Sequence, residues 1–134
     1  MQIDYALLAE HAEVTGNKLY LMGGGWDTMF APDVPAPVRV VCATGIRVDW
    51  DETNITLPIT LTIEDDDAQE VFRIQGQMNV GRPPNLAIGS SQLYQMAATM
   101  QVTLPRFDGY RVVVAVGEGD AALRKAIPFR LARR

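Results

Sequence analysis

Histidine and cysteine, two residue types common in catalytic sites, each occur once in this 134-residue chain, as His11 and Cys42. His11 lies near Glu10 and Glu13, a spacing that provides neither a metal-binding pair nor a nucleophile beside its base. Cys42 falls on the apolar side of an alternating run, where burial disfavours the reactive thiolate. The chain has no Gly-x-Ser-x-Gly elbow, phosphate-binding loop or zinc-ligand spacing. We therefore expect no catalytic residues and no cofactor, and a protein that is not an enzyme.

Carboxylates concentrate in the middle of the chain and suggest a cation site. Calcium takes six to eight oxygen ligands, and C2-type sandwich domains gather aspartates on neighbouring loops for this purpose. The acidic turns at 49–54 and 65–69, however, flank one predicted strand and so fall at its opposite ends. We favour solvated turns, with a cation at Asp65–Asp67 as the alternative. The segment from Val48 to Phe72 has no basic residue and eight acidic ones: Asp49, Asp51, Glu52, Glu64, Asp65, Asp66, Asp67 and Glu70.

The charge distribution limits the classes of partner. The formal net charge of −4 opposes binding to nucleic acid. From Arg106 to the last residue, seven basic residues outnumber three acidic ones, a net +4 against −8 in the middle segment. Two opposite patches could orient a second copy or another protein, but we favour charges that are solvated or paired within one chain. No apolar run is long enough to cross a bilayer, and the single cysteine and polar start predict a cytoplasmic protein with no membrane partner.

Two segments are candidate docking sites for a partner. Three glycines at 23–25 precede Trp26, and the prolines that follow argue against a phosphate-binding helix, so we expect a kink where the chain crosses between sheets. The 11 residues of 81–91 form a long loop, and long ordered loops are often functional. This loop could instead cover one end of the fold. The docking candidates are Arg82, Pro83, Pro84, Leu86, Ile88 and Trp26.

The elements that would position these residues are strands, because apolar residues recur with a period of two. Alternate residues face inward from Val38 to Trp50 and from Ile55 to Ile63, and four later segments show the same alternation. Pro58 favours a sheet edge or a bulge, and Gly76 a bulge. Residues 5–14 contain many helix formers, but the turn signal at 15–17 predicts a hairpin with residues 18–22. The total is about eight strands.

The segment from Leu104 to Val116 identifies the type of fold most closely. A Gly109-Tyr110 pair opens a strand after a turn, as in the tyrosine corner of sandwich domains, where the tyrosine hydroxyl ties down the preceding residues. We therefore predict one domain over residues 1–134, an antiparallel β-sandwich of the immunoglobulin-like or C2-like type. A chain of this length buries a sufficient core without disulfides.

Several blocks of the sequence resemble an uncharacterised family of small bacterial proteins. The resemblance extends over nearly the whole chain, and its most specific blocks are the Gly-Gly-Gly-Trp and Gly-Arg-Pro-Pro motifs. It implies a single β-sandwich domain and no known activity or site residues. The matching blocks are 6–10, 18–27, 52–54, 80–84, 109–110 and 128–129.

We therefore expect an interaction or assembly module that binds another protein or itself. Four apolar residues in the solvent-facing phase of predicted strands support this expectation, unless the proline-rich loop or the last strand covers them: Val71, Leu93, Val113 and Ala115. The alternative is a ligand-binding sandwich for calcium or carbohydrate, with Trp26, Trp50 or Tyr94 as a stacking platform.

Overall fold

The protein is all-β, and the computed structural model describes residues 1–134. It has ten strands rather than about eight, because the first predicted strand is divided at Glu10 and because a short strand, β4, was not predicted. The strands are β1 (Gln2–Ala9), β2 (His11–Thr15), β3 (Lys18–Met22), β4 (Thr28–Ala31), β5 (Ala36–Val48), β6 (Leu57–Asp65), β7 (Glu70–Met78), β8 (Gln92–Leu104), β9 (Gly109–Val116) and β10 (Leu123–Arg133).

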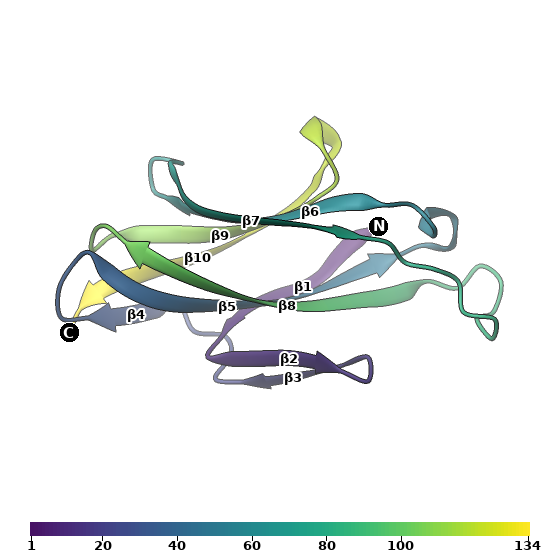
Figure 1. Cartoon of the computed structure of the whole chain (residues 1–134), viewed down its shortest axis with the longest axis horizontal. Coiled ribbons are helices and arrows are strands. Elements are labelled where there is room, and N and C mark those ends of the chain that lie inside the picture. Colours follow the sequence, from purple (N-terminus) through teal and green to yellow (C-terminus); the bar gives the residue numbers. More distant parts are fainter.

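Two sheets face one another across the main core, and a hairpin forms a third layer (Figure 1). One sheet has the order β1-β5-β8 and the other β4-β10-β9-β6-β7. The β2–β3 hairpin lies against the outer face of the three-stranded sheet. All strand pairs are antiparallel except β4 and β10, which are parallel, so the expectation of a wholly antiparallel fold is wrong at this pair. The crossing from β3 to β4 runs through Gly23 and Gly25, both with positive φ (64° and 82°), as the predicted kink requires.

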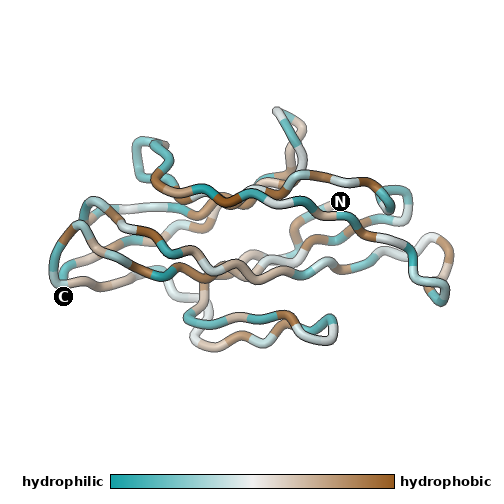
Figure 2. Tube along the Cα trace, in the orientation of Figure 1, coloured by the Kyte–Doolittle hydropathy of each residue, from teal (hydrophilic) through white to brown (hydrophobic).

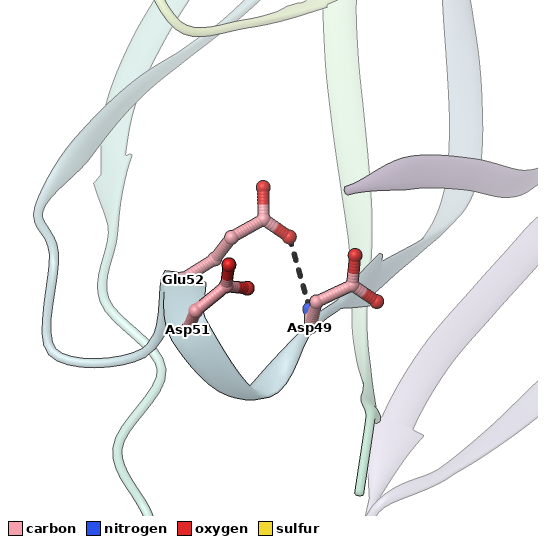
Figure 3. Close-up of side chains that lie close together, drawn as sticks. All are labelled: Asp49, Asp51 and Glu52. Atoms are coloured by element: carbon pink, nitrogen blue, oxygen red, sulfur yellow. Dashed lines mark hydrogen bonds between the residues drawn. The ribbon is translucent and has the colours of Figure 1, made fainter. Parts of the chain in front are cut away.

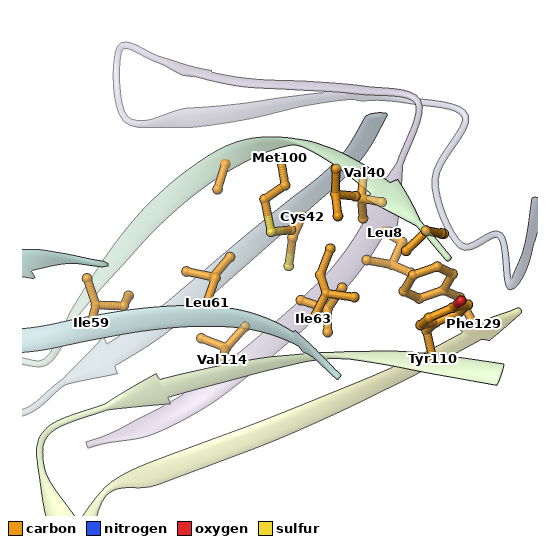
Figure 4. Close-up of a cluster of buried hydrophobic side chains, with 14 of the residues drawn as sticks. Leu8, Val40, Cys42, Ile59, Leu61, Ile63, Met100, Tyr110, Val114 and Phe129 are labelled. Atoms are coloured by element: carbon orange, nitrogen blue, oxygen red, sulfur yellow. The ribbon is translucent and has the colours of Figure 1, made fainter. Parts of the chain in front are cut away.

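The alternating residues meet in the main core as the sequence predicts (Figure 4). Cys42 and Ile46 of β5 and Ile63 of β6 are all fully buried. The predicted faces are wrong only at their ends: Trp50 lies in a short 3-10 turn after β5, and Ile55 precedes β6 and is 48% exposed. At Trp50 the chain leaves the strand because the carboxylate of Glu52 accepts a hydrogen bond from the backbone N–H of Asp49 and so closes the turn.

A second, smaller core explains why β5 is buried on both faces. Val41 and Ala43 point away from the main core and contact Ala12 of the hairpin, together with Leu19 and Leu21. The predicted hairpin forms with the register His11↔Met22 to Thr15↔Lys18. Its two-residue turn has positive φ at both positions, Gly16 (58°) and Asn17 (60°), which matches the twist of the flanking strands.

Two expectations about strand irregularities are wrong. Pro58 lies in β6, an internal strand, but the ladder between β6 and β9 begins only at Ile59. Its carbonyl accepts a hydrogen bond from Gly117, so its missing N–H faces the point where β9 has ended. Gly76 pairs regularly with Ile59, and the register shift of this hairpin lies instead at Ile63 and Glu64.

The tyrosine corner is present. The hydroxyl of Tyr110 donates to the carbonyl of Arg106 (2.7 Å) and accepts from its backbone N–H (3.1 Å). The Arg106 guanidinium in turn binds the carboxylate of Asp65 at 2.9 Å. Turns that join the strands are mainly hydrophilic (Figure 2), and neither short helical turn has the length and apolarity to span a membrane.

Candidate functional site

The predicted docking loop is fixed at its base by Arg82. The Arg82 guanidinium donates to the hydroxyl of Thr53 (2.6 Å) and to the carbonyl of Trp50 (2.7 Å). It also lies 4.1 Å from the centre of the Trp50 ring, a cation–π contact. The side chain of Gln92 closes the base from the other end by donating to the carbonyl of Gly81 (2.8 Å). These contacts join the loop to the 3-10 turn after β5.

The rest of the loop consists of two consecutive turns. The N–H of Leu86 donates to the carbonyl of Pro83 (3.0 Å), and the N–H of Ser90 donates to that of Ala87 (3.1 Å). Pro83 and Pro84 are exposed, and their rings restrict the backbone where the first turn begins. Ile88 lies within the second turn and is 90% exposed, the highest exposure of any large apolar side chain here. The loop therefore presents an apolar side chain from a hydrogen-bonded frame.

A groove of about 540 Å³ lies between this loop and the tip of the β2–β3 hairpin. Leu86 lines it from the loop, Leu93 and Tyr94 from β8, and Asn17 from the hairpin tip. The tip is held in place because the Gln95 amide donates to the Asn17 carbonyl (3.0 Å). Leu86 and Leu93 are apolar residues that the alternating strand pattern does not place in the core, and the groove gives both side chains a location.

Trp26, the sixth docking candidate, is far from this loop. Its ring meets Phe129 of β10 edge-on, with ring centres 5.7 Å apart, and packs against the main core. It also lines a groove of about 240 Å³ with Ala9 and Phe30. Phe30 belongs to β4, which lies near the other end of the molecule from the 81–91 loop (Figure 1). Phe30 is 56% exposed. The six candidates therefore do not form one surface: five share the loop, and Trp26 belongs to a separate region.

The acidic side chains also separate into two groups. Asp49, Asp51 and Glu52 place carboxylate oxygens within 4.8 Å of one another on the turn after β5 (Figure 3). The N-terminal ammonium of Met1 already lies 2.8 Å from Glu52 and 3.3 Å from Asp49. This contact raises the pKa of the ammonium and lowers that of Glu52. A cation would have to compete with that charge.

The acidic turn at 65–67 lies at the opposite end of β6, as the count of strand reversals predicts. The buried Asp65 accepts hydrogen bonds from the backbone N–H groups of Gln69 and Asp67, both at 2.9 Å. These donors, together with Arg106, hold the pKa of Asp65 below its ordinary value. Asp65 is committed to the turn and to the tyrosine corner, whereas Asp66 and Asp67 are exposed.

Cys42 and His11 lie on opposite sides of the three-stranded sheet, because Cys42 faces the main core and His11 belongs to the hairpin on the outer face. Burial raises the pKa of the Cys42 thiol to about 11, and the thiol contacts the Thr44 hydroxyl at 3.6 Å. His11 is exposed on the outer side of the hairpin, opposite Met22. A thiol with this pKa is not a nucleophile near neutral pH.

Sequence reasoning missed the apolar outer side of the hairpin. Tyr20 and Met22 are two residues apart on β3 and are 52% and 71% exposed. In β3 they alternate with Leu19 and Leu21, and this alternation would have predicted that Tyr20 and Met22 face outward. The sequence predicts Val71, Val113 and Ala115 as solvent-facing apolar residues. Val113 and Ala115 line a mostly polar groove on the outer face of the five-stranded sheet. Val71 is only partly exposed and packs against the main core.

Comparison with known proteins agrees with the uncharacterised family expected from the sequence blocks. No curated protein matches the chain. The model of a family of unknown function, DUF6941, matches residues 4–132, which is nearly the whole chain. The protein therefore belongs to this family, DUF6941.

Proposed function

We propose that this protein is a non-catalytic interaction module that binds another protein through the 81–91 loop. The observation that supports this most directly is Ile88, which is 90% exposed on a loop whose base Arg82 holds in place. Transferring an exposed isoleucine side chain from water to an apolar pocket is worth about 1.5–3 kcal/mol before the costs of association are subtracted. A loop that is already ordered also loses little conformational entropy on binding.

The groove beside the loop extends this contact surface. Leu86, Leu93 and Tyr94 line the groove with apolar surface beside the 81–91 loop, and Gln92 and Asn17 line it with polar groups. Protein interfaces likewise combine apolar contact area with hydrogen-bonding groups. The partner we propose therefore has one apolar side chain for the groove and an apolar pocket for Ile88.

The carbohydrate-binding alternative has weaker support. Arg82 occupies one face of the Trp50 ring, and Trp26 is partly buried with its ring edge-on to Phe129. A stacking platform needs an open aromatic face. The Met1 ammonium beside Asp49 and Glu52 likewise disfavours calcium at that turn.

We also propose an immunoglobulin-like classification and a location in the bacterial cytoplasm. The bond from the Tyr110 hydroxyl back to Arg106 supports the first, since a tyrosine corner is characteristic of such sandwiches. The single, buried and unpaired Cys42 supports a reducing compartment. The bacterial source rests on the resemblance of the sequence blocks.

The experiment is a comparison of partner capture by matched variants in cells of the source organism. Ile88→Ser removes the exposed side chain from the loop, and Ile55→Ser removes another exposed isoleucine (48%) from outside it. We expect Ile88→Ser to lose the captured partner at least tenfold and Ile55→Ser to retain it, with both thermal midpoints within a few degrees of the parent. Equal capture by the parent and Ile88→Ser contradicts the proposed docking role.

A further inference from the structure

The exposed edge of β8 differs from the other three edges of the two main sheets. Exposed edges favour pairing with another strand, and proteins usually prevent this with charges, prolines, bulges or very short strands. β1 has a register shift beside Asp4, β4 has only four residues, and β7 carries the charged pair Glu70 and Arg73. β8 pairs with β5 over 13 residues with no register shift. It contains no charged residue and no proline.

The direction of one hydrogen bond establishes which backbone groups of β8 are free. The carbonyl of Leu8 in β1 accepts from Gly25, so it points away from β5. Leu8 and its partner Cys42 in β5 therefore form a non-hydrogen-bonded pair, and the backbone N–H and C=O of Cys42 point to the other side, toward β8. There Cys42 is paired with Ala98, so Ala98 directs its own backbone groups to β5. Even-numbered residues of β8 therefore bond to β5, and odd-numbered residues present their N–H and C=O groups at the open edge. None of the backbone hydrogen bonds outside the ladders involves residues 92–104.

The sequence of β8 is nearly symmetric about Ala98. Residues 95–101 read Gln-Met-Ala-Ala-Thr-Met-Gln, so the chain is close to the same in both directions. In an antiparallel pair of two such strands related by a twofold axis at Ala98, Gln95 lies opposite Gln101 and Met96 opposite Met100. Ala97 then lies opposite Thr99. The glutamines share the outer side, and the methionines share the core side, where Met96 is still partly exposed.

From this geometry we propose that β8 pairs with β8 of a second copy to form a twofold-symmetric dimer. The free groups of residues 95, 97, 99 and 101 supply four hydrogen-bonded residue pairs, or about eight backbone hydrogen bonds. The result is one continuous sheet with the order β1-β5-β8-β8-β5-β1 across two chains. No like charges face one another, because the strand has none. A second copy is the occupant because the segment reads nearly the same in the antiparallel direction, so that glutamine meets glutamine and methionine meets methionine across the axis. The inference uses the edge alone and does not rest on the docking role of the 81–91 loop.

The test combines mass measurement with a proline at two edges. Thr99 is exposed and its N–H is free, so Thr99→Pro removes no hydrogen bond within one chain but blocks the proposed pairing. The matched control is Gln75→Pro on β7. The Pro58 carbonyl points to β9, so its neighbour Ile59 bonds to β7 and Gln75 has its own N–H at that open edge. Sedimentation should give twice 14.7 kDa for the parent and for Gln75→Pro, and Thr99→Pro should dissociate at a concentration at least about tenfold higher.

A second variant and a second measurement cover the case in which a proline variant fails to fold. Thr99→Lys keeps the backbone donor and places two like charges about 7–8 Å apart across the axis, so it should also weaken the dimer. In the parent, amide exchange at Ala97, Thr99 and Gln101 should slow as protein concentration rises, while exchange at Ala98 and Met100 stays slow throughout. A parent that remains a 14.7 kDa monomer at millimolar concentration overturns the proposal. A dimer that both Thr99 variants leave intact overturns it as well.

Discussion

Replacing Tyr110 with phenylalanine tests whether the tyrosine corner stabilises this fold. The substitution removes two hydrogen bonds, one donated to the Arg106 carbonyl at 2.7 Å and one accepted from its N–H at 3.1 Å. The ring stays, with its stacking on Phe129 (5.7 Å between ring centres). At about 0.5–1.5 kcal/mol for each bond, unfolding should cost about 1–3 kcal/mol less.

That loss corresponds to a measurable change in melting temperature. An unfolding entropy of about 2.1 cal/mol/K per residue gives about 0.28 kcal/mol/K for this chain, so the midpoint should fall by about 4–11 °C. The control is Tyr20→Phe, because Tyr20 is 52% exposed and its hydroxyl has no partner in the chain. Calorimetry and urea unfolding would measure both variants. Equal midpoints for Tyr110→Phe and Tyr20→Phe would refute the assignment of a stabilising role to the corner.

Three further predictions concern the loop, the buried thiol and the acidic turn. Arg82→Ala should speed amide exchange within residues 81–91 and leave exchange in the core strands unchanged, because the hydrogen bonds and the cation–π contact of Arg82 are with Trp50 and Thr53. Hydrogen exchange by mass spectrometry measures both, and unchanged exchange in the loop contradicts the anchoring role. Cys42, with its thiol pKa raised to about 11, should react with a thiol reagent at pH 8 only as fast as the chain unfolds, and rapid labelling of the folded protein would disprove its burial. The lowered pKa of Asp65 stabilises the fold fully above its unfolded value of about 3.8, and this contribution is lost as the pH falls through the folded value. Asp65→Asn should therefore be less stable than the parent at pH 7, with a difference in urea midpoint that narrows below pH 3.8; a difference independent of pH would contradict this linkage.

The strands of the main core were predictable because burial of alternate residues dominates their sequences. Val40, Cys42 and Ile46 each face the core as the period of two requires. The same pattern could not reveal a third layer. Val41 and Ala43 are small apolar residues in the outward phase, and only the position of the hairpin explains their burial.

The ends of strands and the parallel pair were less predictable, because they depend on contacts distant in sequence. Trp50 leaves the core phase where Glu52 closes the turn at Asp49, and its ring is then covered by Arg82 from a loop 32 residues away. β4 is four residues long and is defined as a strand by its pairing with the end of β10. Tyr110 was predictable, since the corner it closes lies only four residues away.

Of the docking candidates, the sequence identified the loop but not its anchoring. The length of the segment and its two prolines indicated an ordered loop, and Ile88 lacked a place in any strand. Arg82 was expected to face a partner, whereas its guanidinium bonds to Thr53 and Trp50 of the same chain. Trp26 and the loop are both docking candidates from the sequence, but the linear sequence contains no information that they lie at opposite ends of the strands.

The two proposed surfaces together imply a bivalent protein. Pairing at Ala98 places the two copies of Gln92, each at the base of an 81–91 loop, 12 residues apart along the joined strands, or about 40 Å. The loops would then lie at opposite ends of the dimer, so that one partner surface with two sites that far apart could engage both. Linked binding of this kind raises apparent affinity well beyond that of one site. On an immobilised partner at high density, Thr99→Pro should therefore lose apparent affinity while keeping the single-site affinity measured in dilute solution, and Ile88→Ser should lose both. If Thr99→Pro binds the dense surface as tightly as the parent, the dimer does not contribute to docking.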